Sequence, residues 1–497
     1  MSGSLIVLGT TSDAGKTVVT TGLCRALARR GLRVAPFKAQ NMSNNSMVTA
    51  DGLEIGRAQW VQAVASRAEP EAAMNPVLLK PGSDRGSHVV VMGRPAGHLD
   101  ARDFARGRQA LARAAYDAFD NLAGRYDVVV CEGAGSPAEV NLRRHDFINM
   151  GLARHASIPA LLVGDIDRGG VFAAMHGTLA LLEEADQALV SGLVVNKFRG
   201  DLDLLRPGLA TLQRVTHRPV LGVLPWQADL WLDSEDSLSA GDRAAPAPTA
   251  GDRLRIAVVR LPRISNFTDI DALCLEPQVE VALVDHPRAL HSADVVLLPG
   301  TRATFADLRW LRERGLDTAI QAHAAAGGAV LGICGGFQML GQQITDPVGV
   351  EGEPDARADG LGLLDVHTTF ATDKVLALPT GRALGVPVSG YEIHHGRVDV
   401  GEDEEFLAGA WQGSVFGTMW HGCLEGDEFR AAWLTTVAEQ AGIASFRAGS
   451  VSFAAAREAR IDAIADAVED HLDLEAILAL VEHGPTLGLP PVRGGLV

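Results

Sequence analysis

Two series of short, continuous apolar runs limit the folds open to this chain more than any other feature of its sequence. In the first half, amphipathic stretches separate the runs SLIVLG, YDVVVCEGAG, IPALLVGDID, VSGLVVNKF and PVLGVLP. The pattern restarts later with RIAVVRLP, VEVALVD, ADVVLLPG and GGAVLGICGG. Strands that are apolar on both faces are typical of parallel sheets covered by helices on both sides. The sequence therefore predicts an α/β protein with two parallel sheets.

The segment between the two series divides the chain. SLSAGDRAAPAPTAGDR is rich in Ala, Pro, Gly and Asp and has no apolar face, so it is predicted to be a linker. At 497 residues the chain is long enough for two or three domains. We predict an N-terminal domain over 1–235, a linker over 236–252 and a second domain over 253–497. The second domain includes C-terminal helices, because AAAREARIDAIADAVEDHLDLEAILALVEHG has apolar residues at helical spacing.

Charge and cysteine content disfavour several classes of protein. The chain has 44 Lys and Arg against 61 Asp and Glu, a formal net charge of −17, which disfavours surfaces for nucleic acid or anionic membranes. The five cysteines form no CxxC pair, so neither a disulfide framework nor a zinc knuckle is expected. No apolar run suits a signal peptide or a membrane span. We expect a cytoplasmic protein that acts on small molecules, and the sequence leaves its oligomeric state open.

The stretch LGTTSDAGKT, residues 8–17, is the first candidate site. It follows the apolar LIVL and precedes the amphipathic KTVVTTGLCRALARRG. This order of strand, loop and helix gathers backbone N–H groups and a helix N-terminus around phosphates. Lys16 would then reach the terminal phosphates of ATP, and the Thr17 hydroxyl would hold Mg²⁺. The predicted nucleotide-binding residues are Gly9, Thr10, Asp13, Gly15, Lys16 and Thr17.

Two acidic residues are candidates for a second ligand of Mg²⁺. Glu132 ends the apolar run VVVCE, and Asp51 lies in TADGLEIGRAQ. The alternatives are a helix cap at Glu132 and an Asp-Gly turn at Asp51. Gly9 and Gly15 enclose one residue more than in the usual phosphate loop, and here the chain resembles the dethiobiotin synthetase-like branch of P-loop NTPases. That resemblance implies phosphorylation of a carboxylate to an acyl phosphate.

A second candidate site surrounds Cys334 in the stretch GICGG. The thiol follows an apolar strand and precedes a helix-like segment, in the arrangement Gly-x-nucleophile-x-Gly. Small neighbours let the chain turn sharply there, and the positive end of the following helix favours a thiolate. Such a thiol needs a base. His421, at the end of SVFGTMWH, is the candidate base, and His394 and His395 compete with it.

The sharp turn at Cys334, the LLPGT loop and His421 together resemble the class I glutamine amidotransferases. That resemblance implies that Cys334 attacks glutamine and that His421 transfers the proton. It also implies an oxyanion hole near Gly300 and Gly335 and a glutamine contact at Gln338. The chain departs from the His-Pro-Glu of that family, because Gly-Cys-Leu follows His421 and the next acid is Glu425. The third member of the triad therefore stays open.

Phrases along nearly the whole chain resemble the cobyric acid synthases, a family of glutamine-hydrolysing amidotransferases in cobalamin biosynthesis. The phrases are FKAQNMSNNS, DGLEIGRAQ, NPVLLKPGSDRGSHVVVMG, EGAGSPAEVNL, LVGDIDRGGVFA, VVNKFRGD, PRISNFTDID and GYEIHHG. The family implies amidation of the b, d, e and g carboxylates of adenosylcobyrinic acid a,c-diamide, with ATP and glutamine. The cation and amides of KAQNMSNNS suit such a corrinoid, and an Asn-rich loop without a ligand is the alternative. The predicted substrate-binding residues are Lys38, Gln40, Asn41, Asn44 and Asn45, with Asp165, Asp167 and Arg168 as further candidates.

Two other functions stay open at this point. A cobyrinic acid a,c-diamide synthase, or another two-domain amidoligase built like CTP synthase, would use the same two sites on another acid. A non-catalytic ATP switch of the partitioning type would hydrolyse ATP slowly, without regard to glutamine or to Cys334. The sequence does not reveal the order of the amidations or the path of ammonia between the domains.

Overall fold

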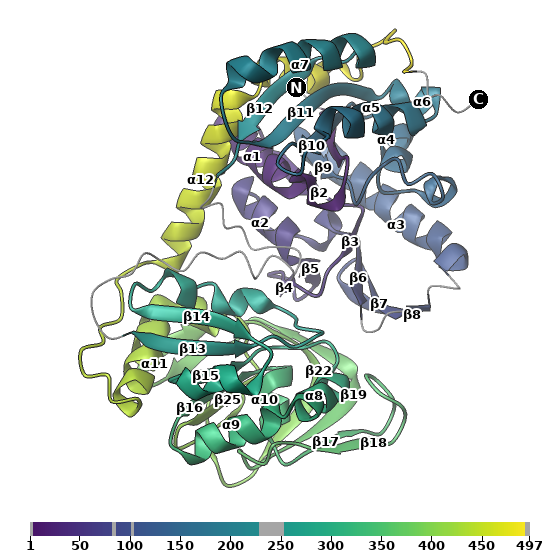
Figure 1. The fold of residues 1–497 in the computed structure, drawn as a ribbon. Coiled ribbons are helices and arrows are strands. Elements are labelled where there is room, and N and C mark those ends of the chain that lie inside the picture. Colours follow the sequence, from purple (N-terminus) through teal and green to yellow (C-terminus); the bar gives the residue numbers. More distant parts are fainter. Residues whose placement is uncertain (1–2, 82–85, 101–103, 228–252, 493–497) are drawn as a thin grey trace.

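The computed structural model describes residues 3–81, 86–100, 104–227 and 253–492, which form an N-terminal and a C-terminal α/β unit (Figure 1). The strands described in the main sheet of the N-terminal unit are β1 Gly3–Gly9, β2 Val34–Phe37, β9 Val128–Glu132, β10 Ala160–Asp165, β11 Val190–Phe198 and β12 Val220–Pro225. They are all parallel and lie in the order β12-β11-β10-β1-β9-β2. The predicted parallel sheet of the first half is confirmed.

Side chains of the central strand show that both faces of this sheet are covered. Leu5 and Val7 of β1 belong to one core, Ile6 and Leu8 belong to another, and all four are fully buried. Successive side chains of a strand point to opposite faces, so an uninterrupted apolar run needs cover on both. The helices of this unit are α1 Lys16–Arg29, α2 Arg57–Ala65, α3 Phe104–Arg125, α4 Met150–Ala156, α5 Val171–Leu181, α6 Glu184–Gln187 and α7 Leu202–Thr216.

Two smaller sheets of the N-terminal unit lie on the side that faces the C-terminal unit (Figure 1). One is the antiparallel pair of β4 Ser46–Val48 and β5 Glu54–Gly56. The chain therefore leaves the main sheet after β2 and reaches the boundary between the units. The other sheet contains, in hydrogen-bonded order, β3 Gln40–Met42, β6 Val77–Pro81, β7 Gly86–Val91 and β8 Arg94–Asp100.

The C-terminal unit contains a second parallel sheet. Its described strands are, in spatial order, β14 Val279–Val284, β13 Leu254–Val259, β15 Val295–Leu298, β16 Ala329–Ile333, β25 Val415–Thr418, β24 Ala410–Gln412 and β23 Glu404–Glu405. The first five are parallel, as predicted, and the last two form an antiparallel edge. The other elements of the unit are α8 Thr304–Arg314, α9 Leu316–Ala325, α10 Gly335–Leu340, α11 Asp427–Gln440, β17 Gln343–Asp346, β18 Ala356–Asp359, β19 Val366–Ala377, β20 Thr380–Ala383, β21 Val386–Ser389 and β22 Glu392–Val400.

The C-terminal helices pack against the N-terminal unit, which differs from their predicted place in the second domain. They are α12 Phe453–His471 and α13 Leu474–His483. Ile461 of α12 and Ile477 of α13 are fully buried in the same core as Val7 of β1. Helical periodicity shows that a segment has an apolar face, but it does not show which sheet that face covers.

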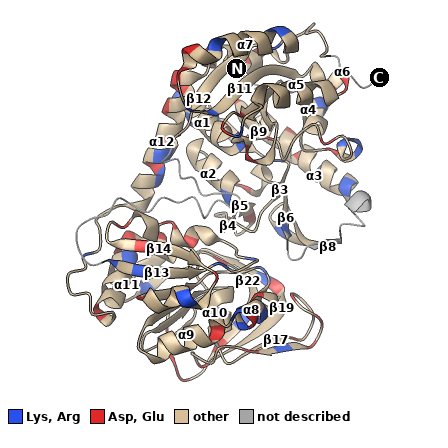
Figure 2. Ribbon diagram, in the orientation of Figure 1, with Lys and Arg blue, Asp and Glu red and all other residues tan. Residues whose placement is uncertain are grey.

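The contact of α12 with α1 combines ion pairs with a close backbone approach. Arg25 of α1 lies 2.7 Å from Glu458, and Arg29 lies 2.9 Å from Asp462, so basic residues of α1 face acidic residues of α12 (Figure 2). A Cβ at Gly22 of α1 would lie 2.5 Å from the Val468 side chain of α12. Glycine therefore permits the two helices to pack this closely.

The chain passes between the two units twice. The first passage is between β12 and β13, where the predicted linker over 236–252 lies outside the described residues. The second is the segment 441–452 between α11 and α12. Among the helices in the described ranges, none combines the length and apolarity that crossing a membrane requires.

Candidate functional site

The predicted phosphate loop connects β1 to α1 and contains the 3₁₀ helix η1 Ser12–Ala14. Gly15 ends the loop in the left-handed conformation, with a φ angle of 92°. A Cβ on Gly15 would lie 2.0 Å from Nδ2 of Asn196, so a side chain fits neither the dihedral angle nor the space. The same Nδ2 donates to the carbonyl of Ala14 at 3.0 Å. The end of β11 therefore holds the loop in place.

Lys16 and Thr17 begin α1 directly after this loop. The Lys16 ammonium folds back over the loop and donates to the carbonyls of Thr11 and Gly135, at 2.9 and 3.1 Å. The Thr17 hydroxyl donates to Oε1 of Glu132 at 2.9 Å. The structure thus brings Lys16, Thr17 and Glu132 together at the carboxyl ends of β1 and β9, the edge where parallel sheets bind ligands.

Glu132 is fully buried and is surrounded by donors. Nζ of Lys38 lies 3.0 Å from its Oε1, and Nε2 of Gln62 lies 2.6 Å from its Oε2. Burial alone would raise the pKa of Glu132, but the charge of Lys38 and the hydrogen bond from Gln62 hold it below its usual range. An ionised carboxylate beside the Thr17 hydroxyl offers the hard oxygen ligands that Mg²⁺ prefers. Within the described ranges, no group of three or more His, Cys, Asp or Glu side chains could hold a metal ion.

The other residues predicted for this site do not all lie close to Lys16. Gly9 lies against Lys16, because a Cβ there would be 2.9 Å from Nζ, and Thr10 is buried beside it. Asp13 lies at the surface of the loop, where Arg168 donates to it at 2.7 Å.

Asp51 is exposed in the connection between β4 and β5. It accepts a hydrogen bond of 2.5 Å from the hydroxyl of Thr49, and the next residue, Gly52, has a φ angle of 76°. This is the geometry of the Asp-Gly turn that the sequence offers as the alternative.

Residues 38–46 extend from the phosphate loop to the C-terminal unit. At one end, Lys38 contacts Glu132. At the other end, the backbone N–H of Ser46 donates to Oδ1 of Asn266, in the C-terminal unit, at 2.9 Å. A single segment therefore contacts both units, and it is the segment in which the sequence predicts substrate-binding residues.

The amide side chains of this segment include acceptors with no protein partner. Oε1 of Gln40 and Oδ1 of Asn44 are buried and have no hydrogen-bond partner among the described residues. Asn41 donates to Gln59 at 3.0 Å, and Asn45 is buried. Buried polar atoms of native proteins are nearly always paired, so these two acceptors indicate a place for a ligand or for water.

Cys334 lies on a sharp turn between β16 and α10, with φ and ψ of 50° and −111°. This is a strained conformation for a residue other than glycine. A Cβ at Gly335 would lie 2.6 Å from the Thr301 side chain, and one at Gly336 would lie 2.1 Å from the carbonyl oxygen of Leu298. The predicted strand, sharp turn and helix are confirmed, and small residues after the thiol are required by the close packing of α10 on the loop after β15.

His421 follows β25 and is held by a carboxylate that the sequence analysis did not single out. Its Nδ1 lies 2.7 Å from Oδ2 of Asp269, on the 3₁₀ helix η5 Phe267–Ile270. Burial disfavours an imidazolium, but the charge of Asp269, followed by that of Cys334, outweighs it and raises the pKa of His421 to about 10. The structure therefore brings Cys334 and His421 together and adds Asp269.

The side chain of Glu425 contacts two arginines and not His421. Its two carboxylate oxygens accept from Arg57 at 2.7 Å and from Arg457 at 2.8 Å. Arg57 belongs to α2 of the N-terminal unit and Arg457 to α12. Glu425 thus forms an ion pair between the units.

The competing histidines His394 and His395 bond to backbone carbonyls. Nδ1 of His394 lies 2.8 Å from the carbonyl oxygen of Gly396, and Nδ1 of His395 lies 3.1 Å from that of Ala371. Burial, with the nearby charges of Lys374 and Arg302, lowers the pKa of His395 to about 4. The contacts of these two histidines leave His421 as the candidate base.

A narrow pocket reaches Cys334 from the boundary between the units. Ser265, Asn266, Thr301 and Gln338 line it from the C-terminal unit, and Lys80 lines it from the N-terminal unit. Gly300 adjoins this site, because a Cβ there would lie 2.7 Å from Cε1 of His421. The predicted neighbours of the thiol, Gly300, Gly335 and Gln338, therefore lie around it.

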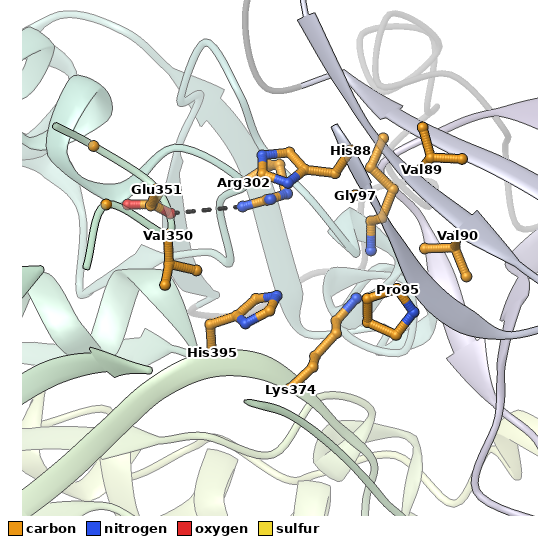
Figure 3. Close-up of a pocket in the computed structure, with 13 residues that line it drawn as sticks. His88, Val89, Val90, Pro95, Gly97, Arg302, Val350, Glu351, Lys374 and His395 are labelled. Atoms are coloured by element: carbon orange, nitrogen blue, oxygen red, sulfur yellow. Dashed lines mark ion pairs between the residues drawn. The ribbon is translucent and has the colours of Figure 1, made fainter. Parts of the chain in front are cut away.

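A larger cavity of about 450 Å³ lies next to this narrow pocket, and Figure 3 shows the residues that line it. His88, Val90 and Pro95 of β7 and β8 line one side, and Arg302, Glu351, Lys374 and His395 of the C-terminal unit line the other. The two pockets share five lining residues, which are Lys80, Arg302, Glu351, Lys374 and His395. The shared residues place the two pockets side by side at the boundary between the units, and Cys334 lines the narrower one.

Two ionisable side chains of this cavity have pKa values shifted towards neutral pH. Burial raises the pKa of Glu351 to about 7, although Arg302 opposes the shift from 3.9 Å. Burial lowers the pKa of Lys374 to about 8 against the charge of Glu54. Glu54 of β5 is fully buried and pairs with Lys374 at 2.5 Å and with Lys80 at 2.7 Å. A carboxylate of the N-terminal unit therefore joins the two lysines across the boundary.

Comparison with known proteins places each unit in a family. Residues 5–239 match the CobQ/CobB/MinD/ParA nucleotide binding domain, and residues 255–429 match the CobB/CobQ-like glutamine amidotransferase domain. A solved glutamine amidotransferase aligns with 38% of this chain and 99% of its own, at 22% identity and a TM-score of 0.31. The cobyric acid synthases of Mycolicibacterium gilvum and Mycobacterium tuberculosis are 65% and 64% identical to this chain over 98% of either sequence. At this identity over nearly the whole length, the chain belongs to the cobyric acid synthase family.

Proposed function

We propose that this protein amidates the b, d, e and g carboxylates of adenosylcobyrinic acid a,c-diamide to give adenosylcobyric acid, in cobalamin biosynthesis. ATP would activate each carboxylate as an acyl phosphate in the N-terminal unit. Ammonia released from glutamine in the C-terminal unit would displace the phosphate. A closed path between the two steps matters, because water would hydrolyse the acyl phosphate.

The observation that carries this proposal is the path of residues 38–46. Lys38 contacts the carboxylate beside Thr17, and Ser46 contacts Asn266, which lines the pocket of Cys334. Between these two ends lie the buried oxygens of Gln40 and Asn44, which have no partner among the residues that the structure describes. A corrinoid held along this segment would present a carboxylate to the phosphate loop on the side from which ammonia arrives.

In the nucleotide half, the proposed roles follow from the cluster at the carboxyl ends of β1 and β9. Lys16 would exchange its backbone carbonyl partners for the terminal phosphates of ATP. Thr17 and Glu132 would hold Mg²⁺, which neutralises phosphate charge when bound. Lys38, already beside Glu132, would orient the carboxylate that is to be phosphorylated.

In the glutamine half, we propose that Cys334 attacks the side-chain amide and that His421 transfers the proton. Backbone N–H groups near Gly300 and Gly335 would hold the oxyanion. The free amino acid would enter through the cavity, with its α-carboxylate facing Arg302 and its α-ammonium facing Glu351. A free amino acid carries one negative and one positive group, and a cavity with one acid among several cations offers a partner to each.

The pocket assignment predicts a selective effect of Glu351→Gln. A hydrogen bond to a charged group contributes about 1.5–3 kcal/mol, so KM for glutamine should rise roughly 10- to 100-fold. Because burial raises the pKa of Glu351 to about 7, wild-type KM should rise as pH falls through this value and the carboxylate takes up a proton. The variant should lose that dependence. Steady-state glutaminase assays between pH 6 and 8 measure both effects.

The matched control is Glu353→Gln, which changes an exposed acid two residues away. It should leave KM for glutamine unchanged. Ammonium-driven amidation should be the same in both variants, and an equal loss there would contradict a role confined to glutamine binding.

Mass spectrometry of the corrinoid product tests the function itself. The enzyme is incubated with ATP, glutamine labelled in the amide nitrogen and either cobyrinic acid or its adenosylated a,c-diamide. Four labelled amides on the a,c-diamide are expected. Two amides on cobyrinic acid would identify an a,c-diamide synthase, and ATP hydrolysis with no labelled corrinoid would contradict the proposal.

A further inference from the structure

We propose that Asp269 is the carboxylate that positions His421 in the Cys334–His421 pair. It would take the role of the acid in the His-Pro-Glu sequence, which this chain lacks. It would hold the imidazole in one tautomer and stabilise the imidazolium that forms when the thiol loses its proton. The proposal rests on the proposed glutaminase function of Cys334, and the experiment below separates the two.

One oxygen of Asp269 bonds to the imidazole and the other to the backbone directly after it. Oδ2 lies 2.7 Å from Nδ1 of His421, and Oδ1 accepts from the backbone N–H of Gly422 at 2.7 Å. The side chains of Asp269 and His421 are only 2% and 1% exposed. Two short bonds between buried groups fix the carboxylate relative to the ring, so the imidazole has little freedom to rotate.

This arrangement selects the tautomer that the reaction needs. A carboxylate only accepts hydrogen bonds, so in the neutral ring that faces a protonated thiol Nδ1 of His421 carries the proton and Nε2 has the lone pair. Once the thiolate forms, the raised pKa of His421 keeps both ring nitrogens protonated. Cys334 is the group that, after Asp269, contributes most to the raised pKa of His421, so the thiol lies within electrostatic range of the ring. Nε2 is therefore the atom able to accept the thiol proton.

Apart from glutamine and water, the reaction needs only the side chains of Cys334 and His421. The proton moves from Sγ to Nε2, the thiolate bonds to the amide carbon of glutamine, and the C–N bond breaks as Nε2 returns the proton to the leaving ammonia. Water activated by Nε2 adds to the thioester, and the C–S bond breaks to give glutamate and the thiol. His421 is cationic in both halves, which is the state that Asp269 stabilises.

The other ionisable groups beside His421 do not offer this support. The ring of Tyr391 stacks on the imidazole at 5.4 Å. Burial, reinforced by the charge of Asp269, raises the pKa of the Cys423 thiol, so this neighbour stays neutral. Glu425 is engaged by Arg57 and Arg457. Among the described residues in contact with the ring, Asp269 is thus the acid that bonds to Nδ1.

Asp269→Asn tests the proposal, because an amide can donate to Nδ1 and stabilise the opposite tautomer. Glutamine hydrolysis by the full-length enzyme should fall by about 10²- to 10⁴-fold in kcat, with KM for glutamine little changed. Loss of the carboxylate should lower the pKa of His421. Alkylation of Cys334 by iodoacetamide, assigned by peptide mass mapping, should consequently require a higher pH.

Two matched variants complete the design. Asp269→Glu restores a carboxylate and should recover part of kcat together with the wild-type pH profile of alkylation. Glu425→Gln, at the acid that follows His421, should leave that profile unchanged. Wild-type kcat in Asp269→Asn, or the loss of kcat in Glu425→Gln instead, would overturn the proposal.

Ammonium-driven amidation distinguishes a failure of this inference from a failure of the proposed function. All three variants should retain it, since none alters the nucleotide half. Its loss in Asp269→Asn would assign Asp269 to the fold and overturn the positioning role. A wild-type enzyme that never hydrolyses glutamine would instead refute the proposed function on which this inference rests.

Discussion

Cys334→Ala is expected to abolish glutamine-driven amidation while ammonium-driven amidation continues. In the proposed mechanism the thiol of Cys334, which lines the narrow pocket, is the nucleophile that attacks glutamine. Loss of a covalent nucleophile should lower the glutamine-driven rate by at least about 10⁴-fold. Labelled nitrogen in the corrinoid, measured with glutamine or with ammonium chloride as donor, gives the two rates.

The rate with ammonium shows whether Cys334→Ala has lost only the reaction with glutamine or amidation as a whole. Alanine at a φ angle of 50° keeps the strain of the turn and removes only the sulfur, so the fold should be retained. Cys423→Ala is the matched control, because this buried thiol lies two residues after His421. Equal loss with both nitrogen donors in Cys334→Ala would contradict a role restricted to glutamine.

Lys16→Ala is expected to remove amidation with either donor. No acyl phosphate forms unless the terminal phosphate is held and its charge is neutralised, and phosphoryl transfer depends almost entirely on such positioning. The rate should fall by about 10²- to 10³-fold or more. Release of phosphate and mass of the corrinoid are measured together.

The control for this variant is Arg30→Ala, just beyond the other end of the same helix. Arg30 forms an exposed ion pair with Glu475, and surface pairs contribute little to stability. It should leave both rates unchanged. Alkylation of Cys334 should proceed normally in both variants, and full turnover by Lys16→Ala would refute the nucleotide site.

The two parallel sheets and the local settings of Lys16 and Cys334 could be predicted because each depends on neighbouring residues. An apolar run, a glycine turn and a helix start follow one another directly at both places, so local chemistry sets the geometry. Gly15 and Gly335 are examples, since a Cβ at either would collide with a neighbouring element.

The partner of His421 could not be predicted, because 152 residues separate it from Asp269. An acid on a short 3₁₀ helix has no local pattern that shows which side chain it contacts. The phrase PRISNFTDID was the available signal, since Asn266 and Asp269 both lie in it. Glu425 shows the opposite case, where closeness in sequence suggested a partner and the fold supplies two arginines from elsewhere.

The return of α12 and α13 to the first unit has a consequence for how the molecule is made. Val7 and Leu23 share a core with Ile461 and Ile477, so the ATP-binding half lacks part of its interior until the last helices leave the ribosome. The glutamine-binding half is then an insertion anchored at both of its ends. Without α12 and α13 the first half would expose an apolar surface, whereas the described strands of the second half all lie between residues 254 and 418.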